Sequence, residues 1–299
     1  MKRALLFLLF LLITQLSPAQ ETSSITELKA DIDSLLDTTE GNFAVAFKNI
    51  SSGEELLINE RREFHAASTM KTPVMLELFR RAELGEFSLE DSLLVKNSFR
   101  SIVSGAPFSL DINQDSGDTL YSQLGSRVSI RDLMVDMIIN SSNLATNLLI
   151  ELVDARKVTA TMRKLGAQDI MVLRGVEDIE AYEAGLSNTT TAYDLLLLFE
   201  KLAEGNYISE AANEEMLAIL LQQQFNDIIP ALLPEGTQVA HKTGSITGVQ
   251  HDSGLVLLPD GRKYVLVLLS DELEDPKQGV ATLAKLSRLI YDHVTGEEQ

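Results

Sequence analysis

Apolar residues recur at intervals of three or four along several stretches of the chain, which is the pattern of amphipathic helices. The first stretch begins at Ser24 and Glu27, which have the form of a capping box, and it predicts a helix over residues 24–38. Within residues 130–153 the pattern predicts two helices, hinged near residues 140–143. The same spacing predicts four further helices, over residues 69–84, 191–203, 209–222 and 277–295. Helices therefore dominate the middle of the chain.

Strand patterns lie near the two ends of the chain. Residues 43–47 alternate between apolar and small or polar side chains, and residues 55–58 can return as the second arm of a hairpin. Three short apolar runs near the C-terminus predict strands, over residues 239–245, 253–258 and 263–270. The predicted fold class is therefore α+β: a three-layer α/β/α unit built on one antiparallel sheet, plus an inserted all-α lobe.

This order of elements also predicts the domain organisation. We expect residues 21–66 and 190–299 to form a discontinuous α/β/α lobe and residues 67–189 to form the all-α lobe. The two lobes would make one catalytic unit, with the active cleft between them. Residues 95–127 are long, polar and glycine-containing, and we expect them to run over the surface and to form a rim of that cleft.

Residues 1–20 have the pattern of a signal peptide. Lys2 and Arg3 form a charged start, residues 4–12 are apolar, and residues 17–20 resemble a cleavage region. The apolar run is too short for a comfortable membrane span, so we expect its removal, no stable membrane anchor, and a periplasmic or secreted protein. The chain contains no cysteine, which excludes both disulfides and a lipid-modified cysteine.

The strong negative charge limits the classes of partner. The formal net charge is −19 at pH 7, and it becomes −21 when Lys2 and Arg3 leave with the signal peptide. Such a surface repels phosphate backbones, so we expect a small-molecule substrate and no nucleic acid. An anionic substrate would need local cations, for which Lys71 and Lys242 are the obvious candidates. No coiled coil or self-complementary stripe is evident, and we expect a monomer.

The candidate chemistry is concentrated in three short motifs, Ser68-Thr69-Met70-Lys71, Ser141-Ser142-Asn143 and Lys242-Thr243-Gly244. Together they supply a nucleophilic hydroxyl, an amine to deprotonate it, a second hydroxyl and a cationic strand edge. These are the parts needed to acylate a serine without a histidine. Each motif alone has a plainer explanation: a capping serine with a solvated lysine, a polar turn, or an edge strand protected by a lysine. Their predicted positions, at a helix start, between two helices and on a strand, favour one shared site.

The motifs and their order resemble those of the penicillin-recognising serine hydrolases, and most closely those of class A β-lactamases, over about residues 24–295. Further segments contribute to the resemblance: residues 128–133, Asn147-Leu148-Leu149, Thr189-Thr190-Thr191 and Ser245. The resemblance implies a β-lactamase/transpeptidase-like fold and an exported serine hydrolase that opens the β-lactam amide. We expect no cofactor and no metal.

The resemblance also implies a role for each matched residue. Ser68 would be the acylated nucleophile, Lys71 would take its proton, and Ser141 would relay a proton to the leaving amide nitrogen. The backbone N–H groups of Ser68 and Ser245 would form the oxyanion hole. Lys242 would lower the pKa of Lys71 as a second cation and would bind the substrate carboxylate. The remaining substrate-binding residues would be Asn143, Thr243, Gly244 and Ser245.

Two departures from the class A pattern affect the expected chemistry. Ser142 stands where the family has a mainly structural aspartate, so we expect a rewired hydrogen-bond network there. The family's Glu-x-x-Leu-Asn segment, whose glutamate activates the deacylating water, is missing from residues 174–183. Ungapped counting from Thr189 places Gly175 at the glutamate position. Three acids can substitute for it or merely be solvated: Glu177, Asp178 and Glu180.

The histidines offer a competing chemistry. A Ser-His-Asp triad would draw on the four histidines and Asp252, but the chain lacks a Gly-x-Ser-x-Gly elbow. These histidines are His65, His241, His251 and His293. No metal-ligand spacing occurs either. Because the deacylation segment is altered, two alternatives to a β-lactamase stay open. One is a peptidase or esterase acting on peptidoglycan-like peptides, and the other is a covalent trap for penicillins.

Overall fold

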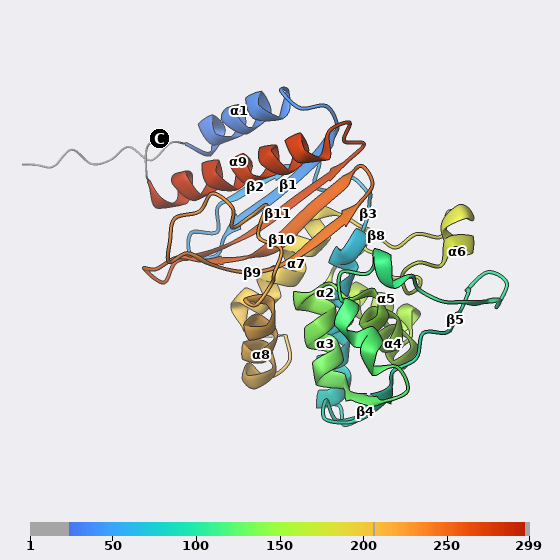
Figure 1. Ribbon diagram of the computed structural model, residues 1–299. Helices are drawn as coiled ribbons and strands as arrows, with labels where there is room; N and C mark the ends of the chain where they lie inside the picture. The colour runs from blue at the N-terminus through green and yellow to red at the C-terminus, as the bar shows by residue number, and fades with distance from the viewer. Residues whose placement is uncertain (1–23, 206, 297–299) are drawn as a thin grey trace, which may run out of the picture.

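The computed structural model describes residues 24–205 and 207–296, so the predicted signal peptide over residues 1–20 lies outside the described part. Its central feature is a five-stranded antiparallel sheet with the strand order β2-β1-β11-β10-β9 (Figure 1). The strands are β1 (Asn42–Asn49), β2 (Glu55–Ile58), β9 (Gln238–Ile246), β10 (Val249–Leu257) and β11 (Lys263–Asp271). Both chain ends therefore contribute to one sheet, as the sequence predicts.

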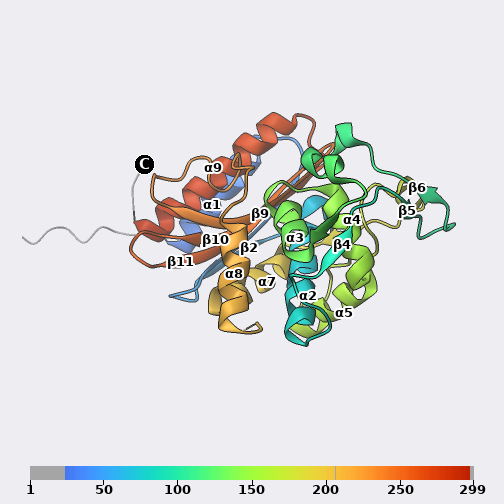
Figure 2. The ribbon, with the colours of Figure 1, turned by 60° about the horizontal axis from the view of Figure 1, so that its bottom comes forward.

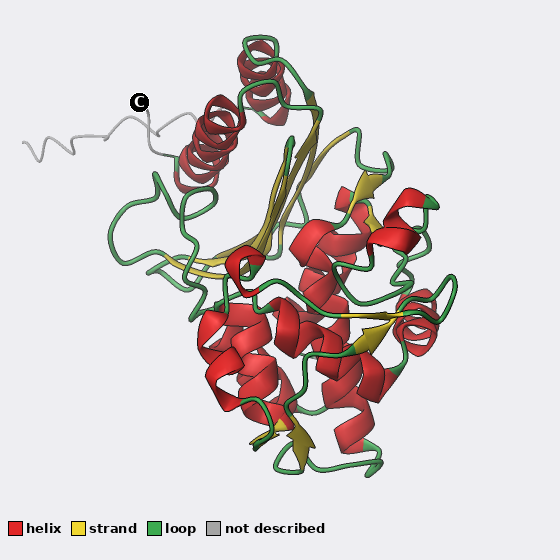
Figure 3. Cartoon of the chain, turned by 45° about the vertical axis from the view of Figure 1, so that its right-hand side comes forward, coloured by secondary structure: helices red, strands yellow, loops and turns green. Residues whose placement is uncertain are grey.

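Helices cover both faces of this sheet and give the predicted three layers. α1 (Ile25–Leu36) and α9 (Pro276–Thr295) lie side by side on one face, and α7 (Ala192–Glu204) packs on the other (Figure 3). β11 alternates accordingly: Leu266 and Leu268 belong to the core beneath α1 and α9, whereas Val265 belongs to the core on the opposite side. The predicted α+β class is confirmed in this respect.

The second lobe is helical and packs beside the sheet on the face opposite α1 and α9 (Figure 3). Its helices are α2 (Lys71–Glu83), α3 (Ile130–Ile139), α4 (Asn143–Val153), α5 (Ala155–Leu165) and the short α6 (Ile179–Glu183). The predicted break between two helices near residues 140–143 is observed between α3 and α4. A 3₁₀ turn (Ala67–Met70) precedes α2, so the helix predicted from residue 69 begins two residues later.

α8 (Glu210–Leu220) connects the two parts of the molecule. It follows α7 in the chain, yet it contacts α2 and α3 of the helical lobe as well as β9 of the sheet (Figure 2). Short two-stranded ribbons add further links: β3 (Phe64–His65) with β8 (Thr189–Thr190), β4 (Ser92–Leu94) with β7 (Arg127–Ser129), and β5 (Phe99–Arg100) with β6 (Pro107–Phe108). The first of these ribbons lies just before the 3₁₀ turn that carries Ser68.

The segment 95–127 is an excursion with little regular structure, as predicted. It contains β5, β6 and two 3₁₀ turns, at Ile112–Gln114 and Asp118–Gln123. Asp115, between these turns, hydrogen-bonds the first residues of α4, so this part of the excursion lies against the helix that follows Ser141-Ser142. Within the described part of the chain, no helix combines the length and the apolar character that a membrane crossing requires.

Candidate active site

Ser68 lies in the 3₁₀ turn that leads into α2, where the edge strand β9 passes close by. A Cβ atom built on Gly244 would lie 3.1 Å from the backbone nitrogens of both Ser68 and Thr69. Glycine at this strand position therefore lets the edge of β9 approach the backbone around the serine. The side chain of Ser68 is half-buried, which leaves it accessible to a small molecule.

Lys71 is fully buried at the start of α2, three residues after Ser68. Its Nζ donates hydrogen bonds to the Ser141 carbonyl oxygen at 2.5 Å, to Ser141 Oγ at 3.1 Å and to Asn143 Oδ1 at 3.0 Å. These contacts use the three N–H bonds of an ammonium group. Burial lowers the pKa of Lys71 to about 7, although nearby carboxylates act in the opposite direction. Near neutral pH the amine is therefore able to exchange a proton.

Lys242 reaches the same hydroxyl from the sheet. It is buried in β9, and its Nζ donates to Ser141 Oγ at 3.1 Å and to the Thr243 carbonyl oxygen at 2.9 Å. Ser141 Oγ thus lies 3.1 Å from each of two amines that come from different lobes. Burial, and then the positive charge of Lys71, lower the pKa of Lys242 well below its ordinary value. An anionic group bound beside Lys242 would raise that pKa again and favour the charged form.

The backbone at Ser141 is strained in a way that supports these contacts. Its φ of 58° lies in the left-handed region, which non-glycine residues seldom adopt. Lys71 binds both the carbonyl oxygen and the hydroxyl of this residue, so the unusual backbone turns two acceptors toward one amine. Residues held in such conformations are found preferentially at functional sites.

Of the three candidate acids, only Glu177 contacts a residue of the motifs. Its Oε1 accepts a hydrogen bond from Asn143 Nδ2 at 2.8 Å, while Asn143 Oδ1 accepts from Lys71. Burial raises the pKa of Glu177. Asp178 is instead a buried cap that accepts from the backbone of the short helix α6 and of the 95–127 excursion, and Glu180 is exposed and bonded to Ser104. Asp178 therefore stabilises the local backbone, and Glu180 lies at the surface.

Gly175, which ungapped counting places at the family's glutamate position, has no room for a side chain. A Cβ atom there would lie 2.2 Å from Asn147 Oδ1. The Asn147 side chain binds both backbone groups of Val176, the residue after Gly175. It donates to the Val176 carbonyl at 3.0 Å and accepts from the Val176 N–H at 2.6 Å. The backbone then turns at Glu177, with a φ of 60°, which carries that carboxylate to Asn143.

Asp115 is a member of the site that sequence reasoning missed. Its carboxylate accepts from the backbone N–H groups of Asn143 at 2.8 Å and Leu144 at 2.9 Å, at the start of α4. Ser142 Oγ accepts from the next N–H group, that of Ala145, at 3.2 Å. The rewired network expected at Ser142 is therefore present, but its carboxylate comes from the 95–127 excursion. No local pattern in that polar segment connects it with α4.

The remaining motif residues lie on β9. Thr243 is half-buried and Ser245 is exposed, so both are in part open to solvent beside Lys242. Ser245 Oγ accepts a hydrogen bond from Gln250 Nε2 at 3.0 Å, its partner across the β-hairpin. The structure thus brings the three motifs together, and it leaves the strand edge that carries Thr243 and Ser245 accessible.

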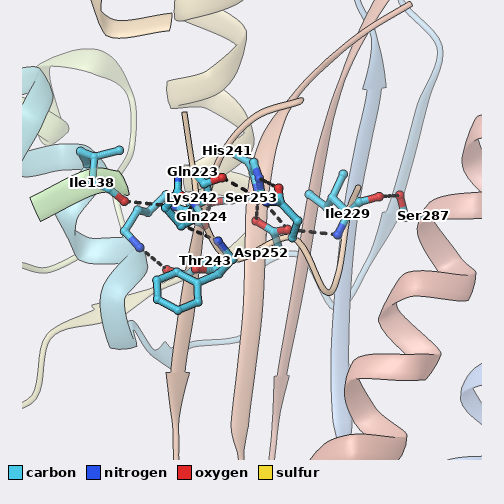
Figure 4. A network of polar contacts seen from close by, with 12 residues as sticks. Ile138, Gln223, Gln224, Ile229, His241, Lys242, Thr243, Asp252, Ser253 and Ser287 are labelled. Carbon is cyan, nitrogen blue, oxygen red and sulfur yellow. Dashed lines mark hydrogen bonds and ion pairs between the residues drawn. The ribbon is translucent and has the colours of Figure 1, made fainter. Parts of the chain in front are cut away.

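The histidines form no catalytic triad with Ser68. His241 Nδ1 lies 2.9 and 3.0 Å from the two oxygens of Asp252 on the neighbouring strand (Figure 4). Its Nε2 lies 3.2 Å from Asn226 Oδ1. This buried pair has no serine as its third member. His65 Nδ1 accepts from the Ala67 N–H, His251 bonds to backbone carbonyls, and His293 bonds to Glu54. Among the described residues, no group of histidine and acid side chains is arranged to hold a metal ion.

Comparison with known proteins places this geometry in a family. The profile of the beta-lactamase enzyme family matches residues 27–294. A β-lactamase from Bacteroides uniformis is 26% identical over 297 residues, which cover 94% of this chain and 96% of that protein.

Solved structures have the same fold. A β-lactamase from Sphaerobacter thermophilus matches with a TM-score of 0.79 and 28% identity, over 91% of this chain and 97% of that one. A mutant of PBP-A, described as an acyl-enzyme complex with penicillin G, matches with a TM-score of 0.77 and 26% identity, over 92% of this chain and 98% of that one. The chain therefore has the β-lactamase/transpeptidase-like fold and belongs to the beta-lactamase enzyme family, a family of hydrolases.

Proposed function

We propose that this protein is an exported serine β-lactamase that is acylated at Ser68. The observation that carries the proposal is the position of Ser141 Oγ, 3.1 Å from both Lys71 Nζ and Lys242 Nζ. A hydroxyl held between two buried amines of lowered pKa is equipped to pass a proton. The half-buried Ser68 stands three residues before Lys71, in the 3₁₀ turn that leads into α2.

Acylation would proceed through three linked proton transfers. Neutral Lys71 takes the proton of Ser68, whose Oγ attacks the lactam carbonyl carbon, and the resulting oxyanion accepts from the N–H groups of Ser68 and Ser245. The C–N bond of the ring then breaks. The leaving nitrogen takes a proton from Ser141 Oγ, which is replenished from the Lys71 ammonium. Lys242 and Thr243 bind the substrate carboxylate during these steps.

Deacylation would use Glu177 as the general base. The glutamate takes a proton from a water molecule, whose oxygen attacks the ester carbonyl carbon. The bond between that carbon and Ser68 Oγ then breaks, and Ser68 Oγ takes up the proton that Glu177 accepted. Glu177 is suited to this role because it is half-buried, hydrogen-bonded to Asn143 and raised in pKa by burial. It replaces the glutamate that has no room at Gly175.

A chromogenic cephalosporin assay tests this function. The wild-type protein should hydrolyse the substrate catalytically, and Ser68→Ala should reduce the rate to the background level. Equal hydrolysis by both proteins would contradict the mechanism. Export is tested separately by the mass of the protein recovered from the periplasm, which should lack residues 1–20.

One observation favours a second candidate, a penicillin-binding covalent trap. The backbone of the 174–178 segment follows a course set by Asn147, and the acid that reaches the site, Glu177, stands two residues after the position that ungapped counting predicts. A relative with the same fold, the PBP-A mutant, is described as an acyl-enzyme complex with penicillin G. Intact-protein mass spectrometry separates the two functions: a trap keeps the adduct on standing, whereas a β-lactamase loses it. Cleavage of D-Ala-D-Ala peptides without β-lactam turnover would favour a peptidase.

A further inference from the structure

Asp115 is a buried carboxylate with four hydrogen-bond donors. Besides the N–H groups of Asn143 and Leu144, it accepts from the Gly117 N–H at 3.0 Å and from the Tyr121 hydroxyl at 3.1 Å. The side chain is 8% exposed, although it belongs to a surface excursion. A carboxylate can accept about four such bonds, so Asp115 is fully satisfied.

These bonds complete the cap of α4. The first N–H groups of a helix have no partner within the helix and must be satisfied from outside. Here Asp115 takes those of Asn143 and Leu144, and Ser142 Oγ takes that of Ala145. The fit is tight, because a Cβ atom on Gly117 would lie 2.3 Å from Ser142 Cβ. The 95–127 excursion is therefore locked against the segment that begins at Ser141.

We propose that Asp115 is a positioning residue for the acylation of Ser68. By fixing the start of α4 it holds the Ser141 and Asn143 side chains against Lys71. This inference rests on the proposed function. Asp115 touches neither the substrate nor the reacting atoms. It acts through the three acceptors of the Lys71 amine, which are the Ser141 carbonyl oxygen, Ser141 Oγ and Asn143 Oδ1.

The charge of Asp115 has a second effect, on the protonation of Lys71. The charged groups that face this amine are Asp115, Asp136 of α3 and Glu177, which raise its pKa, and Lys242 of β9, the second cation. Asp115 is the strongest of the three carboxylates in this respect. Removing its charge lowers the pKa of Lys71 further, so that the neutral amine persists to lower pH.

The test compares Asp115→Asn with Asp275→Asn. Asp275 is a matched control because it also accepts from two successive backbone N–H groups at a helix start, those of Lys277 and Gln278 in α9, which lies on the sheet face opposite the helical lobe. The rate of acylation by a chromogenic cephalosporin is measured as a function of pH by stopped-flow absorbance. Thermal melts establish that both variants are folded.

Asp115→Asn should change the profile in two ways. At alkaline pH, where Lys71 is neutral in both proteins, the acylation rate should fall at least about tenfold, or about 1.4 kcal/mol of barrier. The rate should rise with pH as Lys71 loses its proton, and this rising limb of the profile should also move to lower pH in the variant. A second variant, Tyr121→Phe, keeps the carboxylate and removes one of its donors, so it should lower the rate less and leave the limb in place. Asp275→Asn should match the wild type.

Two results would overturn the proposal: an alkaline rate for Asp115→Asn equal to that of the wild type, or a reduced rate with an unmoved rising limb. Failure of the positioning role is distinguished from failure of the proposed function by two measurements: amide hydrogen exchange at Leu144 and formation of the Ser68 adduct by the wild type. Faster exchange in Asp115→Asn together with a wild type that forms no Ser68 adduct would refute the function, and with it the positioning role in acylation. A normal wild-type adduct with an unaffected variant would refute the role of Asp115 alone.

Discussion

Replacing Glu177 by glutamine isolates the deacylation step. In the native protein Oε1 accepts from Asn143 Nδ2 at 2.8 Å, and Oε2 lies 3.4 Å from the Asp111 nitrogen. Glutamine has the same shape, and its carbonyl oxygen can still accept from Asn143. Its amide nitrogen cannot take a proton from water. The substitution therefore removes the base and leaves Asn143, which accepts from Lys71, in place.

The two half-reactions should respond by very different amounts. A positioned general base contributes about 10²- to 10⁴-fold, so the rate of deacylation should fall by that factor, or about 2.7 to 5.4 kcal/mol of barrier. Acylation should change less than about tenfold. The Asn143 hydrogen bond becomes neutral rather than charge-assisted, and such a change costs on the order of 1 kcal/mol. The acyl-enzyme should therefore accumulate.

Intact-protein mass spectrometry after rapid mixing with a penicillin measures both rates through the growth and decay of the adduct. Glu180→Gln is the matched control, because that acid belongs to the same segment but is exposed and bonded to Ser104. The reasoning is refuted if the adduct of Glu177→Gln decays as fast as that of the wild type. A long-lived adduct in Glu180→Gln instead would assign the base to the other acid.

Three further predictions concern the pH profile and the framework of the site. The acylation rate should rise with pH through about 7 and then level off, because only neutral Lys71 accepts the Ser68 proton; a profile flat across neutrality would contradict this role. Gly175→Ala should lower the free energy of unfolding by about 1–3 kcal/mol in a urea titration, since its Cβ meets Asn147 at 2.2 Å. Asp252→Asn should cost about 1–3 kcal/mol in the same titration, because the buried His241 loses its carboxylate partner; an unchanged midpoint would show that the pair is dispensable.

The fold was largely predictable because its main elements have clear patterns. The apolar run of β11 and the capping box of α1 can be read locally from the sequence. α5 was not predicted. It begins directly after α4, with only Asp154 between them, and neither glycine nor proline marks the break. A φ of 64° at Asp154 makes the turn, and such a conformation at aspartate leaves little trace in the sequence.

The site was predictable only where residues belong to a motif. Ser68, Lys71, Ser141 and Lys242 stand in motifs whose order favours one site. The choice among Glu177, Asp178 and Glu180 depended on the course of an irregular loop, which is fixed by the contact of Asn147 with Val176. Asp115 depended on the packing of a surface excursion against α4. Such long-range contacts between irregular segments have no periodicity from which they can be read.

The claim that Ser68 is acylated beside two buried amines is tested most directly by peptide mapping. The protein is mixed with penicillin, quenched within its first turnover, digested and analysed by mass spectrometry. We expect the mass of one penicillin on the peptide that contains Ser68, and no such peptide from Lys71→Met, which lacks the amine that takes the proton. An adduct on another residue, or equally fast acylation of Ser68 without the Lys71 amine, would contradict the account.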